Sequence, residues 1–317
     1  MEYRRLGNSG LEVSAVGLGT NNFGWRMDAQ QADRVIHQAI ELGINLLDSS
    51  NSYGRGLSEE HIGKSIKGMR SKLVVATKVS SPTGDGSNQR GTSRKHIMEE
   101  VEKSLTRLGT DYIDLYQVHY PDYDTPIEET LRTLDDMVRQ GKVRYIGCSN
   151  YAAWRVAEAI WTSRALHLET FVSAQPEYNM LDRRAERELV PCCQAYGLGI
   201  LPYYPLASGF LTGKYHRGQP VPEGTRLSGN SRAQERTLTG SNFDLLERLE
   251  AFAVEREHTM VELAIAWLLA TPAVSSVIAG ATKPEQVVAN AKAAPWRMTP
   301  QEKQQVDAVL DAARRGS

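Results

Sequence analysis

Cysteine is scarce in this sequence, and the arrangement of its three cysteines excludes two common uses of the thiol. Cys192 and Cys193 are adjacent, and Cys148 stands alone. An odd number that includes two neighbours suits neither a disulfide framework nor a zinc site, which needs separated ligands. The composition therefore predicts a protein of a reducing compartment, which we take to be the cytoplasm, without a bound metal.

An excess of charge and long apolar runs are also missing. Lys and Arg total 37 against 38 Asp and Glu, a net charge of −1. This balance argues against nucleic acid or an anionic membrane as the main partner. No run approaches the ~18 apolar residues that a membrane helix needs, and residues 1–5 lack the apolar core of a signal peptide. We therefore expect small molecules as partners, with no nucleic acid and no membrane, and the oligomeric state stays open.

The chain does have a regular alternation of strand and helix patterns, with no internal linker. Helical patterns cover 29–42, 93–108 and 127–139 and begin again at 58, and Ser93 is a candidate N-cap. Apolar runs predict eight strands, at 16–20, 43–48, 73–78, 113–119, 143–148, 171–174, 199–203 and 274–279. Eight strands separated by helices favour an α/β fold of the closed (β/α)8 TIM-barrel type, as a single domain over 1–317.

Two segments lie outside this alternation. Residues 6–13 predict a β-hairpin turned at Asn8-Ser9-Gly10, which would plug one end of the barrel. Residues 206–242 hold few apolar side chains and several Gly and Pro. A connection this long is usually functional or disordered. Because it follows strand seven, we expect it to lie over the carboxyl ends of the strands as a flap.

Ionisable side chains stand at the predicted ends of three successive strands. Asp48, Lys78 and His119 end strands two, three and four, and Tyr53 follows Asp48 by five residues. Active sites of parallel α/β folds lie at the carboxyl ends of their strands. We therefore expect these four side chains to meet there.

The four side chains make chemical sense as a proton-donating site. A phenol has an unperturbed pKa of about 10, and the neighbouring Lys78 ammonium is expected to lower the pKa of Tyr53 towards neutrality. Asp48 would balance the charge of Lys78, and His119 would hydrogen-bond a substrate oxygen. The set predicts proton donation to a carbonyl oxygen that is becoming an alkoxide. Taken one at a time, the same residues also fit a structural ion pair, a loop aromatic and a buried histidine.

The sequence around these residues resembles a known family. Residues 46–54 (LLDSSNSYG) and 58–64 (SEEHIGK) look like the signature of the aldo-keto reductases. Similar segments continue in the family's order at 141–150, 175–179, 205–215 and 280–286. The branch that the chain most resembles includes bacterial aldo/keto reductases and potassium-channel β subunits. The resemblance implies a TIM barrel, a nicotinamide cofactor and four catalytic residues, Asp48, Tyr53, Lys78 and His119.

A Rossmann domain is not predicted, because no Gly-x-Gly-x-x-Gly segment follows a strand and opens a helix. In a barrel, phosphates are held by the loops after strands seven and eight and by a helix N-terminus. Residues 280–284 suit this role, with Pro284 at the first turn of a helix. The Lys283 ammonium favours NADP over NAD, which stays possible. The flap would add Lys214 and Arg226 near the pyrophosphate.

The resemblance also implies a set of cofactor contacts. Tyr203 would stack on the nicotinamide ring, and Tyr204 stands where many relatives carry Ser. The implied set is Gly19, Thr20, Asn21, Asp48, Ser149, Asn150, Gln175, Tyr203, Tyr204, Pro205, Leu206, Ser208, Gly209, Leu211, Lys214, Gly280, Ala281, Lys283, Gln286 and Asn290.

The sequence thus predicts an NAD(P)H-dependent oxidoreductase that interconverts a carbonyl compound and an alcohol. Asn22, Trp25, Tyr120 and Tyr123 follow predicted strand ends and are candidate lining residues of the substrate pocket. Aromatic walls suit sugars and planar ketones alike, so aldehydes, ketones and sugars all remain candidate substrates.

Two other functions stay open at this point. Potassium-channel β subunits keep reductase-like sites while serving a membrane protein, although this chain begins at the hairpin without an N-terminal extension. An isomerase or lyase on the same barrel would use Tyr53 and Lys78 without a cofactor. Pull-down of a membrane partner with negligible turnover would favour the first, and failure to bind nicotinamide would favour the second.

Overall fold

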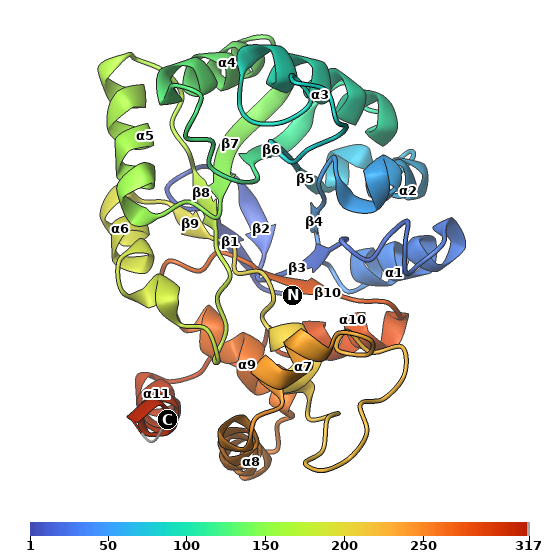
Figure 1. The fold of residues 1–317 in the computed structure, drawn as a ribbon, viewed down its shortest axis with the longest axis vertical. Helices are drawn as coiled ribbons and strands as arrows, with labels where there is room; N and C mark the ends of the chain where they lie inside the picture. The colour runs from blue at the N-terminus through green and yellow to red at the C-terminus, as the bar shows by residue number, and fades with distance from the viewer. Residues whose placement is uncertain (316–317) are drawn as a thin grey trace.

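A curled parallel sheet inside a ring of helices forms the body of the molecule (Figure 1). The computed structural model describes residues 1–315. The eight parallel strands are β3 (Val16–Gly19), β4 (Leu46–Asp48), β5 (Val74–Val79), β6 (Ile113–Val118), β7 (Val143–Ser149), β8 (Ser173–Gln175), β9 (Gly199–Ile200) and β10 (Val277–Gly280). They lie side by side in chain order, and the last strand, β10, pairs with the first, β3. The barrel closes where the residues leading into β10 meet β9: Ile200 N donates to Ala273 O at 2.7 Å, and Ser275 N donates to Ile200 O at 3.0 Å. Within β10, Ile278 N donates to Pro202 O, just after β9, at 3.0 Å. The predicted (β/α)8 barrel is confirmed.

Helices cover the outside of the barrel (Figure 1). They are α1 (Ala29–Glu41), α2 (Leu57–Ser65), α3 (Arg94–Leu108), α4 (Ile127–Arg139), α5 (Ala153–Ala165), α6 (Leu189–Tyr196), α7 (Ser231–Thr237), α8 (Gly240–Val254), α9 (Met260–Leu269), α10 (Pro284–Ala291) and α11 (Pro300–Arg315). Short 3-10 turns are η1 (Tyr53–Gly56), η2 (Arg70–Lys72), η3 (Arg184–Glu186) and η4 (Ala207–Thr212). The Ser93 side chain accepts from His96 N and caps α3, as predicted. Among residues 1–315, no helix has the length and apolar character needed to cross a membrane.

The N-terminal hairpin plugs the barrel at the amino ends of its strands. Strands β1 (Tyr3–Arg5) and β2 (Glu12–Ser14) are antiparallel. Leu6 and Val13 are fully buried in a small apolar cluster with residues that begin two strands, Leu46 and Val74. The plug is confirmed, but the strands lie further out than predicted. Leu6 N donates to Leu11 O at 2.8 Å, so most of the 6–13 segment is the turn itself.

Three strands near the C-terminal half of the barrel differ from their predicted bounds. Strand seven was expected over 199–203, but β9 contains two residues, since Pro202 has no N–H to donate to a neighbouring strand. Strands six and eight each lie further along the chain, and they end at Gln175 and Gly280. Both shifts place an expected site residue, Gln175 or Gly280, at the carboxyl end of its strand.

The 206–242 segment is partly helical. It contains η4, all of α7 and the first turn of α8. The helices start at capping residues: the Asn230 side chain accepts from Ala233 N, and the Thr239 side chain accepts from Asn242 N. These are residue types that favour helix N-termini. The long connection predicted after strand seven is therefore present, and it carries short helices of its own.

Candidate active site

A cavity of about 720 Å³ opens at the carboxyl ends of the barrel strands. Asp48 ends β4, and His119 follows β6 directly. Lys78 is the penultimate residue of β5, because the strand ends one residue later than predicted, at Val79. Tyr53 begins η1, the irregular turn between β4 and α2. The structure brings all four predicted catalytic side chains together: Asp48, Tyr53 and His119 line this cavity, and Lys78 is buried behind its wall.

Lys78 is the centre of this group. Its Nζ donates to Asp48 Oδ2 and to Ser49 O, both at 2.7 Å, and lies 3.5 Å from the Tyr53 hydroxyl. Asp48 Oδ1 accepts from Gln117 Nε2 at 3.2 Å and from Gln175 Nε2 at 2.9 Å. Lys78 is completely buried. A buried ammonium and carboxylate are tolerated when they pair and their remaining hydrogen-bonding positions are filled, as here.

The pKa of Tyr53 departs from the sequence-based expectation. Burial, and then the Asp48 charge, raise the pKa of the phenol well above its ordinary value. The expectation that Lys78 lowers this pKa towards neutrality was wrong, because Lys78 is paired with Asp48 and the desolvation of the phenol dominates. Tyr53 is therefore protonated at neutral pH. That is the state required of a group that gives a proton away.

His119 is held as a neutral imidazole. Burial, followed by the charge of Lys78, lowers the pKa of His119 to about 3. Ser50 Oγ and Ser81 Oγ lie 3.2 and 3.1 Å from its Nδ1. A hydroxyl that donates to Nδ1 leaves the single ring proton on Nε2, which can then donate to an oxygen in the cavity. The ring stacks on Tyr120 at a centroid distance of 4.5 Å.

This neutral histidine predicts a specific loss of stability in acid. The unfolded chain binds a proton at His119 below pH about 6.5, whereas the folded chain does so only near pH 3. Protons therefore favour the unfolded state as the pH falls through this window. Between pH 7 and pH 5, we expect wild type to lose about 2 kcal/mol more unfolding free energy than His119→Gln does. Urea unfolding of both proteins across this range measures the difference; parallel curves would contradict the assignment.

Cations without carboxylate partners line the other side of the cavity. Lys283 lies at the N-terminus of α10, where Pro284 occupies the first turn as predicted. Burial, and then the charge of Arg26, lower the pKa of Lys214. Within residues 1–315 no ion pair involves any member of the set Arg26, Lys214, Arg226 and Lys283, all of which line the cavity. A β-carbon on Gly209 would lie 2.6 Å from Lys214 Nζ, so a side chain at position 209 would displace the Lys214 ammonium. This wall is suited to phosphate groups.

Part of the segment between η4 and α7 crosses the cavity. Arg226 Nη2 donates to Asn21 Oδ1 at 3.2 Å and to the Tyr204 hydroxyl at 3.1 Å. Asn21 follows β3, and Tyr204 follows β9, so this bridge passes over the end of β10, which lies between them. Residues 223–226 of the segment line the cavity, which agrees with the flap predicted over the strand ends.

Comparison with known proteins agrees with this architecture. A model of the Aldo/keto reductase family matches residues 15–311. The chain belongs to the aldo/keto reductase family. At 37% identity it is similar to a probable voltage-gated potassium channel subunit beta of Oryza sativa subsp. japonica, over 98% of this chain and 97% of that protein. At 34% identity it is similar to L-glyceraldehyde 3-phosphate reductase of Escherichia coli, over 92% and 87%. An uncharacterized oxidoreductase of Bacillus subtilis is 37% identical over 90% and 89%. The comparisons support an oxidoreductase, from a family that generally uses nicotinamide cofactors.

Most residues expected to contact cofactor or substrate in this aldo/keto reductase line the cavity. Those that do are Gly19, Thr20, Asn21, Asn22, Asp48, Tyr120, Ser149, Asn150, Gln175, Tyr203, Tyr204, Pro205, Leu206, Ser208, Gly209, Lys214, Gly280, Ala281, Lys283, Gln286 and Asn290. Several are fixed by hydrogen bonds: the Tyr203 hydroxyl donates to Asn150 Oδ1 at 2.7 Å, and Asn150 Nδ2 donates to His119 O at 2.9 Å. Their assignment as ligand contacts stays a prediction.

Three of the expected residues do not reach the cavity. Leu211 is buried in the apolar core because η4 turns its side chain inward. Trp25 is 60% exposed and donates its indole N–H to Asn21 O. Tyr123 is 64% exposed and stacks on Trp154 at 6.2 Å. Trp25 and Tyr123 were predicted to line the cavity because they follow strand ends, but that position does not determine the direction in which a loop side chain points.

The sequence reasoning also missed residues that support this aldo/keto reductase site. Gln117 binds Asp48, and it stands two positions before His119 on a strand. Alternate residues of a strand share a face, so Gln117 was open to prediction. Arg26 follows the first strand in a loop where a cation could also have been noted. Ser50 and Ser81 bind His119, and nothing in their local sequence marks them.

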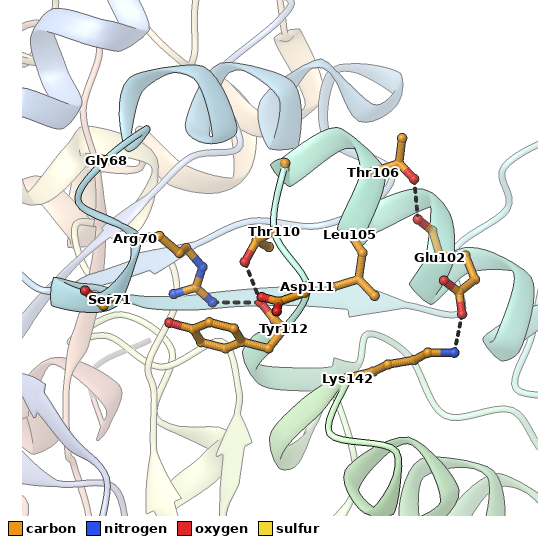
Figure 2. A pocket seen from close by; sticks show the side chains of 11 residues that line it. Gly68, Arg70, Ser71, Glu102, Leu105, Thr106, Thr110, Asp111, Tyr112 and Lys142 are labelled. Carbon is orange, nitrogen blue, oxygen red and sulfur yellow. Dashed lines mark hydrogen bonds and ion pairs between the residues drawn. The ribbon is translucent and has the colours of Figure 1, made fainter.

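A second, larger cavity of about 980 Å³ lies near the amino ends of β5, β6 and β7 (Figure 2). Three of its four charged side chains already form ion pairs: Arg70 with Asp114 at 2.7 Å, and Lys142 with Glu102 at 2.5 Å. Figure 2 shows Arg70 pointing to the backbone of Tyr112, to which its Nη2 donates at 2.9 Å. This hollow is on the opposite end of the barrel from Tyr53. Its size therefore does not make it the better candidate site.

Proposed function

We propose that this protein reduces a small aldehyde, ketone or sugar to an alcohol with NAD(P)H, and that Tyr53 gives the proton. The observation that carries the proposal is the contact set of Tyr53, Lys78, Asp48 and neutral His119 at the wall of the cavity. A protonated phenol and an imidazole N–H are two donors suited to one carbonyl oxygen.

Each residue has a distinct task in the proposed reduction. His119 orients the carbonyl oxygen by donating from Nε2. Tyr53 transfers its hydroxyl proton to that oxygen as negative charge develops there. Lys78, 3.5 Å away, stabilises the phenolate left on Tyr53. Asp48 keeps Lys78 in place through their ion pair. The nicotinamide cofactor, when bound, supplies the hydride that reduces the carbonyl carbon.

The unpaired cations support a phosphate-bearing cofactor. Arg26, Lys214 and Arg226 are available to a pyrophosphate, and Lys283 at the start of α10 to a further phosphate. A helix N-terminus adds its own attraction for an anion. We therefore propose NADP as the preferred cofactor, since its 2′-phosphate supplies a partner for Lys283 that NAD lacks.

Replacing Lys283 by Met tests this preference. We expect the NADPH dissociation constant to rise about 10-fold or more, because a charge-assisted hydrogen bond contributes about 1.5–3 kcal/mol, while the NADH constant hardly changes. Fluorescence titration with both cofactors measures this. Lys292→Met, an exposed lysine just after α10, is the control. Tighter binding of NADH than of NADPH by the wild type would overturn the preference.

An assay with a panel of aldehydes, ketones and sugars, monitored by NADPH absorbance, tests the proposed reaction itself. Turnover with at least one class is expected. Tight cofactor binding without any turnover would instead favour a regulatory role.

That regulatory role is the second candidate, because the Oryza sativa relative is named as a probable channel β subunit and is similar over almost its whole length. Recovery of a membrane channel with the tagged protein, together with negligible turnover across the panel, would establish it in place of the reductase.

A further inference from the structure

The segment that carries Tyr53 has no regular structure of its own. Between β4 and α2 it contains only η1, and Gly54, Arg55 and Gly56 have φ values of 57°, 57° and 95°. A β-carbon on Gly54 would lie 2.5 Å from Phe23 O. Arg55 is strained in this left-handed region, where L-residues are disfavoured by roughly 1–2 kcal/mol. A segment of this kind keeps its shape only if surrounding groups hold it.

Asn51 provides such an attachment on two sides. Its backbone N–H donates to Lys78 O at 3.2 Å, and its Nδ2 donates to Glu100 Oε2 at 2.8 Å. Asn51 is 3% exposed and Glu100 is 1% exposed. Two residues further on, Tyr53 N donates to Ser50 O at 3.1 Å. Asn51 therefore connects the turn that carries the phenol to β5 on one side and to α3 on the other.

Glu100 is a buried carboxylate with its charge balanced. Lys103 Nζ donates to Oε1 at 2.8 Å, and Thr83 Oγ1 lies 3.4 Å from the same atom. His96 on the same helix and Tyr116 from β6 also face it. Burial opposes the charge, but hydrogen bonds from Lys103 and Asn51 hold the pKa of Glu100 below its usual range. An ionised acceptor makes a shorter and stronger hydrogen bond than a neutral one.

We infer that Glu100 is a positioning residue for the reduction, acting through Asn51 to hold Tyr53 against Lys78 and His119. The inference rests on the proposed role of Tyr53. Glu100 itself lies behind the cavity wall and touches none of the reacting groups. Without its bond to Asn51, the turn loses this hydrogen bond to α3, and the phenol can leave its place beside Lys78.

Exchanging the two side chains tests the inference. Asn51→Asp places two carboxylates at hydrogen-bonding distance, so at neutral pH they repel and the turn is displaced. The double variant Asn51→Asp with Glu100→Gln restores a donor and an acceptor in reversed order, with the same total charge. We expect kcat of Asn51→Asp to fall about 10–100-fold, as misplacement of a catalytic group does, and the double variant to recover most of it. Glu100→Gln alone keeps an acceptor for Asn51 and should lose little. Glu99→Gln, in an exposed pair with Lys95 on the same helix, is the control.

The pH profile separates positioning from a general loss of structure. Asn51→Asp should recover relative to wild type as the pH falls and its two carboxylates share a proton. The cofactor dissociation constant should be the same in all variants, since Asn51 and Glu100 do not line the cavity. A double variant as impaired as Asn51→Asp, or an unimpaired Asn51→Asp, would overturn the inference.

Hydrogen exchange provides a readout that does not depend on turnover. The amides of Asn51, Tyr53 and Arg55 donate within this turn or to β5. They should exchange faster in Asn51→Asp and regain protection in the double variant. If wild type proves inactive with every carbonyl, the reduction fails, and this exchange pattern still shows whether Glu100 holds the turn. Unchanged exchange in Asn51→Asp overturns the inference in either case. Should Asn51→Asp not fold, Asn51→Ser removes the donor without adding charge, and faster exchange of the same amides is expected.

Discussion

Tyr53→Phe is expected to reduce the rate of carbonyl reduction by about 10²–10⁴-fold, the usual contribution of a general acid. The ring keeps its edge-on contact with His119, at a centroid distance of 5.8 Å, and only the hydroxyl is lost. Among residues 1–315, the one hydrogen-bonding neighbour of this hydroxyl is Lys78 at 3.5 Å, so folding should be unaffected. Steady-state kinetics, with thermal unfolding and cofactor titration alongside, measure these effects.

Tyr123→Phe is the matched control for this substitution. Tyr123 is exposed and lies outside the cavity, so removing its hydroxyl should leave turnover unchanged. Activity of Tyr53→Phe within a few-fold of wild type would exclude Tyr53 as the proton donor.

Lys78→Met is expected to lower both turnover and stability. The Asp48 charge would stay buried without its partner, which typically costs about 3–5 kcal/mol of unfolding free energy. The same charge already raises the pKa of Tyr53. Without Lys78 to offset it, the phenolate formed by proton donation becomes less stable, and kcat should fall. The fall can be measured as long as enough of the variant stays folded. Urea unfolding and kinetics on the folded fraction give the two quantities.

The double variant Lys78→Met with Asp48→Asn separates the two effects. Removing both charges should restore much of the lost stability, because no unpaired carboxylate remains. It should not restore turnover, because the phenolate still lacks a neighbouring cation. Recovery of activity in the double variant would show that Lys78 is needed only to neutralise Asp48.

The sequence predicted the barrel because each strand–helix unit carries its own signals. The apolar run before Asp48, the Ser93 cap and the helix α4 were all visible locally. The two-residue strand β9 was not, because strand length depends on the partner strands as well as on composition. Pro202 was the signal that argued against a longer strand.

The electrostatics of the site could be predicted only in part. The sequence placed Lys78 near Tyr53, and the structure confirms this proximity. The direction of the phenol's pKa shift depends on how deeply the ring is buried and on the pairing of Lys78 with Asp48, which are three-dimensional quantities. The same limit applies to the bridge from Arg226 to Asn21, whose members are far apart in the chain.

The pairing of β10 with β3 has a consequence for the synthesis of the protein. β3 is the first barrel strand to be synthesised, and its partner β10 is the last. The barrel therefore has an open edge until residue 280 has left the ribosome. Gly19 and Gly280 lie opposite each other across this seam, and the loops that follow both strands line the cavity. The proposed nucleotide cofactor would contact both sides of the seam, so its binding site would be complete only in the finished barrel. By mass action, binding of that cofactor would then stabilise the seam between β3 and β10.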